Sequence, residues 1–254
     1  NSLTSTSGES AFLASYNPAG IFRWVRLIEM ESMSFPIYSF EDNADLSIYN
    51  NGWNNTNIVA GFGNWFYIPA SGVSVSGRRE LNSATPLEGS RSWQIMATNY
   101  FFGVARTIIP HLTNGTISVL VRHGYTPTGG FNGFNLSRPS ASSSVFGDYF
   151  TEIISCSMNS SNQITVTVDF GYKPSFTLEP TTDGNLQGDL LEYTINVRKS
   201  GPWTLSIRNL SEPGTPITST NFALFFTSNI VRSIRFGTFI GNTNQFLGFD
   251  RIQI

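Results

Sequence analysis

Charge is scarce in this chain. Only 13% of its 254 residues are Asp, Glu, Lys or Arg, against about 25% in an average globular protein. Basic residues number 15 and acidic residues 17, which leaves a formal net charge of −2. The basic pairs Arg78-Arg79 and Arg198-Lys199 are isolated from one another. Because no basic stripe could follow a phosphate backbone, we do not expect the chain to bind nucleic acid.

Cysteine, histidine and long apolar runs are also scarce. The single cysteine, Cys156, excludes an intrachain disulfide, and its strand-like surroundings predict a small buried side chain. No apolar run approaches about 18 residues, so we expect no membrane span. The two histidines, His111 and His123, belong to no hydrolase or zinc motif. The sequence therefore predicts a protein that is not an enzyme.

Polar character comes instead from Ser, Thr, Asn and Gly, a composition common on secreted and surface proteins. The chain opens on Asn1 and carries no signal peptide, so we take it as a mature form or an excised domain. The near-absence of cysteine fits a bacterial, archaeal or viral surface protein. We expect a secreted or extracellular location.

From Phe35 onward, apolar and polar residues alternate with a period of two. Residues 163–170 give the clearest case, with Ile164, Val166 and Val168 on one face. Turn signals such as Asn114-Gly115 separate about a dozen runs of this kind. The pattern predicts an all-β fold, an antiparallel two-sheet jelly-roll sandwich over residues 35–254. Within it, residues 126–144 are expected to form the longest irregular stretch.

Residues 1–34 form an N-terminal arm in this interpretation. Asn17 and Pro18 resemble the start of a helix, and apolar residues follow at helical spacing, which predicts a short helix over about residues 18–30. The alternatives are a strand through Phe22, Trp24 and Arg26, or an extended arm that docks on a neighbouring molecule.

The final strand carries a carboxylate among apolar residues. In a regular strand, Asp250, Ile252 and Ile254 share one face, so Asp250 is expected to enter the core and to need a partner. A backbone amide, an arginine or a metal ion would serve. An early acidic segment offers Glu41 and Asp42, and Ca²⁺ prefers oxygen ligands. The sequence thus gives Glu41, Asp42 and Asp250 as candidate ligands of a structural Ca²⁺.

Several segments in a fixed order resemble the laminin-G-like (concanavalin A-like) jelly roll. They are Phe40-Glu41-Asp42, Tyr49-Asn50-Asn51-Gly52-Trp53, Leu87 to Ile95, Gly115 to Arg122, and Gly248-Phe249-Asp250-Arg251-Ile252-Gln253-Ile254. Carbohydrate-binding jelly rolls show a similar pattern. In calcium-bearing members, the ion lies between the early acidic segment and the last-strand Asp. The resemblance therefore implicates Asp42 and Asp250, with Glu41 beside them, although Arg251 stands where a second acid often does.

Two sets of residues are candidates for binding or cleaving carbohydrates. Aromatic rings that stack on sugars must be exposed, and the candidates for a carbohydrate-binding platform are Trp53, Trp65, Tyr67 and Trp93, each of which could equally fill the core. Arg78-Arg79-Glu80-Leu81 and Gln94-Ile95-Met96 resemble two strands of alginate-lyase-type sandwiches. The third motif of those enzymes is missing from this chain.

Three functions follow from these observations. The first is an extracellular structural or adhesive surface protein, a self-assembling subunit of an appendage, coat or virion, whose arm docks on another copy of the chain. The alternative is a carbohydrate-binding module with a glycan as partner. The weakest is a polysaccharide lyase or hydrolase that depends on Glu80.

Overall fold

The computed structural model describes residues 10–16, 22–29, 40–68, 76–99, 101–124, 131–138, 152–171, 173–225, 230–239 and 246–254. The chain divides into two compact units, Asn1–Tyr38 and Ser39–Ile254. Each unit has its own set of β-strand pairs.

The first unit contains a β-hairpin and not the helix expected over residues 18–30. Strand β1 (Ser10–Tyr16) pairs antiparallel with β2 (Phe22–Glu29). The strand alternative was therefore right for this segment. Short apolar runs fit a helical and an extended period alike, and β2 is rich in aromatic and branched residues, such as Trp24 and Val25, that favour strands.

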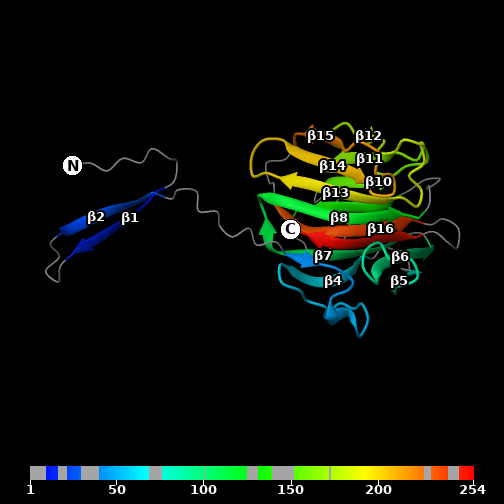
Figure 1. Cartoon of the computed structure of the whole chain (residues 1–254), viewed down its shortest axis with the longest axis horizontal. Coiled ribbons are helices and arrows are strands. Elements are labelled where there is room, and N and C mark those ends of the chain that lie inside the picture. The colour runs from blue at the N-terminus through cyan, green and yellow to red at the C-terminus, as the bar shows by residue number, and fades with distance from the viewer. Residues whose placement is uncertain are drawn as a thin grey trace. The chain divides into compact units, whose positions relative to one another are not determined.

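The second unit is a sandwich of two antiparallel sheets (Figure 1). The eight-stranded sheet runs in the order β15 (Thr218–Phe222), β14 (Trp203–Asn209), β13 (Leu190–Val197), β8 (Gly115–His123), β17 (Leu247–Gln253), β6 (Ser92–Asn99) and β5 (Ser76–Asn82), with β3 (Glu41–Asp42) paired to β17. The seven-stranded sheet runs in the order β12 (Phe176–Leu178), β11 (Ile164–Val168), β10 (Glu152–Met158), β9 (Asn132–Ser137), β16 (Val231–Phe239), β7 (Phe101–Leu112) and β4 (Phe62–Ile68). The described helices are the short 3₁₀ turns η1 (Ser47–Tyr49) and η3 (Asp169–Gly171), and neither is long and apolar enough to cross a membrane.

Residues that alternate along the sequence lie on two different sides of each strand in the structure, one facing the core and one facing solvent. Along β13, buried and half-buried residues alternate without a break, and Ile164, Val166 and Val168 of β11 all lie in the core. Cys156 is also fully buried in β10. These predictions from the sequence are confirmed.

Strand β9 lies inside the stretch that was expected to be irregular over residues 126–144. The sequence does not reveal this strand, because glycine stands at position 133, where any side chain would collide with the neighbouring strand β10. A Cβ at Gly133 would lie 2.0 Å from the carbonyl oxygen of Cys156. Residues 125–130 and 139–151 lie outside the described part of the chain.

An ion pair crosses the core between the two sheets. Asp42 of β3 and Arg106 of β7 are both fully buried, and the Arg106 Nε lies 2.8 Å from the Asp42 Oδ2. The Tyr49 hydroxyl donates to Asp42 Oδ1 at 2.8 Å and accepts from Trp65 Nε1 at 2.9 Å. Burial raises the pKa of Asp42 to about 6, while Arg106 and the Tyr49 hydroxyl act to lower it. The network therefore keeps Asp42 ionised at neutral pH.

Replacing Arg106 should reveal how much the sandwich depends on this pair. Arg106→Met leaves Asp42 buried without its counter-charge, so we expect the free energy of unfolding in urea to fall by about 3–5 kcal/mol. The double variant Arg106→Met/Asp42→Leu, which removes both charges, should recover much of that loss. A single variant that loses under about 1 kcal/mol would show that the pair is dispensable.

Candidate functional site

The last strand is joined to the early acidic segment. Register pairs Ile252 with Asp42 and Gln253 with Glu41, and Phe40 and Ile254 exchange backbone hydrogen bonds of 3.0 and 2.9 Å. Segments from opposite ends of the sandwich domain thus meet at one seam. The sequence suggested this neighbourhood, and the strand pairing confirms it.

A β-bulge changes the direction of Asp250. Between Asp250 and Gln253, β17 has one residue more than its partner β8, where the corresponding positions are Leu120 and Ser118. Arg251 is the extra residue and has a left-handed φ of 43°. The expectation that Asp250 shares the core face of Ile252 is therefore wrong, because a bulge shifts the alternation by one.

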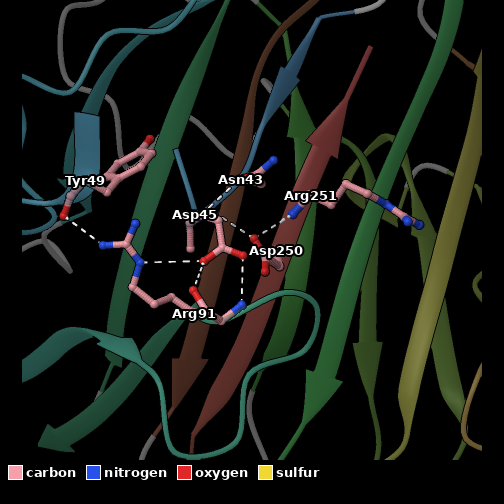
Figure 2. Close-up of polar contacts among 8 residues, drawn as sticks. Asn43, Asp45, Tyr49, Arg91, Asp250 and Arg251 are labelled. Atoms are coloured by element: carbon pink, nitrogen blue, oxygen red, sulfur yellow. Dashed lines mark hydrogen bonds and ion pairs between the residues drawn. The ribbon is translucent and has the colours of Figure 1, made fainter. Parts of the chain in front are cut away.

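Asp250 is nevertheless buried, with 2% of its surface exposed. Its Oδ1 accepts hydrogen bonds from the backbone N–H groups of Ala44 at 3.0 Å and Arg251 at 2.9 Å (Figure 2). Burial raises the pKa of Asp250 to about 7; the two backbone amides oppose this rise, and the carboxylates of Asp45 and Glu88 add to it. The required partner is thus the backbone, one of the options that the sequence left open.

A surface pocket of about 290 Å³ lies at this seam. It is lined by Glu41, Asn43, Asp45, Glu88, Asp250, Arg251 and Gln253. Asp45 is held in place, since its carboxylate accepts from Ser90 N at 2.9 Å and Ser90 Oγ at 2.6 Å and lies 3.7 Å from Arg91 Nε (Figure 2). Arg251 binds the carboxylates of Glu88 and Glu192. Every group that lines the pocket is polar or charged.

The expected Ca²⁺ ligands do not come together as a set. Asp42 faces the core and is occupied by Arg106 and Tyr49, whereas Glu41 and Asp250 line the pocket. Within the described ranges, no group of three or more His, Cys, Asp or Glu side chains is arranged to hold a metal ion. These residues do not fit the calcium site that the resemblance implies. Asp42 in particular is a structural residue, because its charge is already compensated.

Three of the four aromatic candidates belong to the core. Trp65 and Trp93 are fully buried and Trp53 is 8% exposed, and their rings pack against one another at centroid distances of 5.1 to 6.1 Å. Buried rings offer no face to a sugar, so the platform expected from Trp53, Trp65 and Trp93 is corrected to a core cluster. Tyr67 differs, because it is 42% exposed, with the Arg79 guanidinium 4.3 Å from its ring centroid.

The outer face of the eight-stranded sheet carries two rows of short polar side chains that the sequence reasoning missed. In register across β8, β13, β14 and β15, the first row is Thr116, Asn196, Thr204 and Asn221, and the second is Ser118, Thr194, Ser206 and Ser219. Gln253 of the pocket pairs with Ser118 and so continues the second row onto β17. The signal was present as the polar half of each alternating strand, but only the register shows that these positions line up.

The rows are linked internally. Thr116 Oγ1 donates to Asn196 Oδ1 at 2.8 Å, Thr204 Oγ1 donates to Asn221 Oδ1 at 2.6 Å, and the Ser206 and Ser219 hydroxyls lie 3.0 Å apart. No charged side chain belongs to either row, so the two rows form a neutral polar band.

The segments that resemble alginate lyases are neighbours in the fold. Glu80 of β5 pairs with Gln94 of β6 in register, and Gln94 Nε2 donates to Glu80 Oε1 at 3.0 Å. Glu80 also lies 3.6 Å from Arg78 Nε. His123, by contrast, is buried, and its ring nitrogens are bonded to Asn132 and Tyr193. Burial lowers the pKa of His123 to about 4, which suits a neutral core residue.

The raised pKa of Asp250 predicts a pH-dependent stability. The folded protein holds this proton up to about pH 7, whereas the unfolded chain releases it near 3.8. This stabilising contribution is therefore complete below the unfolded pKa and is lost as the pH rises through 7, by at most about 4 kcal/mol. Urea unfolding of Asp250→Asn, which keeps an acceptor for both amides, should show a flatter profile over this range. Identical profiles for the two proteins would contradict the assignment.

No family model matches the chain, and no curated protein matches it. Solved structures match its fold. The globular domain of T. cruzi calreticulin has a TM-score of 0.50 at 11% identity, over 74% of this chain and 82% of that chain. The metal-free lectin I-B4 from Griffonia simplicifolia has a TM-score of 0.45 at 12% identity, over 74% and 97%. The metal-free carbohydrate recognition domain of Emp46p has a TM-score of 0.45 at 12% identity, over 84% and 95%.

At these identities the likeness concerns the fold alone. The two antiparallel sheets, the closing strand between β8 and β6, and the match to the calreticulin domain agree with the order of segments in the sequence. The second unit of this chain has a concanavalin A-like jelly-roll fold.

Proposed function

We propose that this protein is an extracellular carbohydrate-binding module that holds a glycan on the neutral polar band. The observation that carries the proposal is the band itself, a charge-free array of hydroxyl and amide groups in register across four neighbouring strands. Neutral sugars present hydroxyl groups that donate and accept, and Ser, Thr and Asn side chains match them in both roles.

The geometry of the sheet supports an extended ligand. Neighbouring strands lie about 4.8 Å apart, so each row repeats its polar groups at a regular interval across the sheet. The short side chains lose little rotamer freedom when they bind. Core residues such as Val119 and Ile195 lie directly beneath them and hold the surface rigid. A pre-organised surface of this kind lowers the entropic cost of binding.

Bulky charged substitutions in the band should abolish glycan binding without unfolding the protein. We expect Thr204→Arg and Ser206→Arg to weaken binding to a panel of neutral oligosaccharides at least about tenfold, or about 1.4 kcal/mol. Binding by the unmodified protein should change little with salt, because no ion pair is involved. Titration calorimetry provides both measurements.

The matched control is Thr177→Arg, an exposed threonine on β12 of the opposite sheet, which should bind as the unmodified protein does. Tyr67→Ala tests the remaining exposed aromatic candidate. A loss of binding in Tyr67→Ala with full binding in Thr204→Arg would move the site to the β4 edge. A panel with no ligand at all would remove glycan binding from consideration.

A second candidate function is self-assembly as a structural or adhesive surface protein. The observation in its favour is the hairpin of β1 and β2, which forms its own compact unit. A lone two-stranded hairpin is marginally stable in water, and this one is rich in apolar residues such as Phe12, Leu13 and Ile28. Docking on a second copy of the chain would complete it.

Truncation tests this second function. If the hairpin mediates association, the full chain should elute as an oligomer on size-exclusion chromatography with light scattering, and a chain that begins at Ser39 should elute as a monomer. Equal masses for the two proteins would count against assembly through the arm.

A further inference from the structure

The pocket beside β17 lies at one end of the neutral polar band. The band is uncharged, whereas the pocket is lined by four acidic side chains and one arginine. Gln253 belongs to both features, since it lines the pocket and pairs with Ser118 in the second row. A ligand that lies along the band can therefore reach the pocket with its end unit. Which end unit the pocket accepts depends on the groups that line it.

The lining groups favour a positive charge. Glu41, Asp45, Glu88 and Asp250 are acidic and Arg251 is basic, so four carboxylates less one guanidinium leave three negative charges when all are ionised. Arg251 is already engaged by Glu88 and by Glu192. Two of its guanidinium nitrogens are therefore occupied by carboxylates, and the net negative charge of the pocket disfavours an acidic sugar.

One carboxylate oxygen in the pocket has no partner. Asp250 is 2% exposed and lines the pocket, and both of its hydrogen bonds are made by Oδ1. Its Oδ2 thus stays without a hydrogen-bond donor from the described residues. Because this oxygen has no donor of its own, a ligand in the pocket can donate a hydrogen bond to it, and a charged donor forms the stronger bond.

The pocket is larger than a bare metal ion requires. Calcium is held by about 6–8 oxygens at about 2.3–2.6 Å, and the described residues contain no such cluster of acidic or histidine ligands. A volume of about 290 Å³ equals roughly ten water molecules at about 30 Å³ each. That is the scale of one six-membered sugar ring with its substituents.

We propose that the pocket binds the protonated amine of a hexosamine unit, with Asp250 Oδ2 as the acceptor and Glu41 and Asp45 as flanking negative charges. This inference rests on the proposed glycan function and specifies its ligand class. The raised pKa of Asp250 supports it, because a bound ammonium stabilises the carboxylate and its binding releases a proton near neutral pH.

A matched pair of oligosaccharides tests the proposal directly. The glucosamine tetramer and the N-acetylglucosamine tetramer share a backbone and differ in whether the nitrogen carries a charge. At about pH 7 and low salt, calorimetry should show that the unmodified protein binds the amine form about tenfold more tightly than the acetylated form. The preference should shrink with added salt, and buffers of different ionisation enthalpy should reveal the released proton.

Two variants assign the preference to the pocket. Asp250→Asn keeps the acceptor for Ala44 and Arg251 but replaces Oδ2 with a donor, and Glu41→Gln changes an exposed side chain that cannot disturb the core. Both should keep the affinity for the acetylated tetramer and lose the preference for the amine. Proton release should disappear in Asp250→Asn.

The outcomes separate this inference from the function on which it rests. Equal affinity of the unmodified protein for both tetramers would overturn the amine site and leave the neutral band intact. A preference that persists in both variants would place the amine elsewhere and also overturn it. Absence of binding to either tetramer or to any neutral oligosaccharide would remove both proposals. Circular dichroism of each variant confirms that it is folded.

Discussion

The ion pair between Asp42 and Arg106 is the contact on which the closure of this sandwich depends. It joins β3 of the eight-stranded sheet to β7 of the seven-stranded sheet through the middle of an aromatic core. Two charges in such a place are stable only as a pair, because each alone would carry a large desolvation cost. Tyr49 donates a hydrogen bond to Asp42 and accepts one from Trp65, so the pair fixes β3, and β3 in turn fixes the position of β17.

The pocket is a consequence of that closure. Once β3 lies against β17, the bulge at Arg251 turns Asp250 away from the core and under the turn at Ala44. The connection between β5 and β6 then adds Glu88 and the Ser90 contacts of Asp45. Acidic groups from three separate segments thus face one another at the surface while Asp42, one residue from Glu41, stays inside. The neighbouring band is neutral because its two rows consist of Ser, Thr and Asn side chains.

Much of this fold could be predicted from the sequence. Alternation identified β11, β13 and β14 as strands, and the ordered segments indicated the jelly roll and the meeting of its first and last strands. The site was less predictable. Trp65 and Trp93 have the composition of a sugar platform, but the same rings serve a core equally well, and burial alone decides between the two uses. The helix over residues 18–30 was wrong because apolar spacing is ambiguous in a short segment.

The sequence by itself determined the fold class, because the alternation of apolar and polar residues that predicts β-strands is a local pattern. Only the tertiary structure decided the direction of Asp250, because a single extra residue in a strand reverses every later side chain and leaves no local mark. The partner of Asp42 was likewise decided in three dimensions, by a strand 64 residues away that belongs to the other sheet. The polar band has the same origin, for its members are ordinary surface residues until strand register sets them side by side.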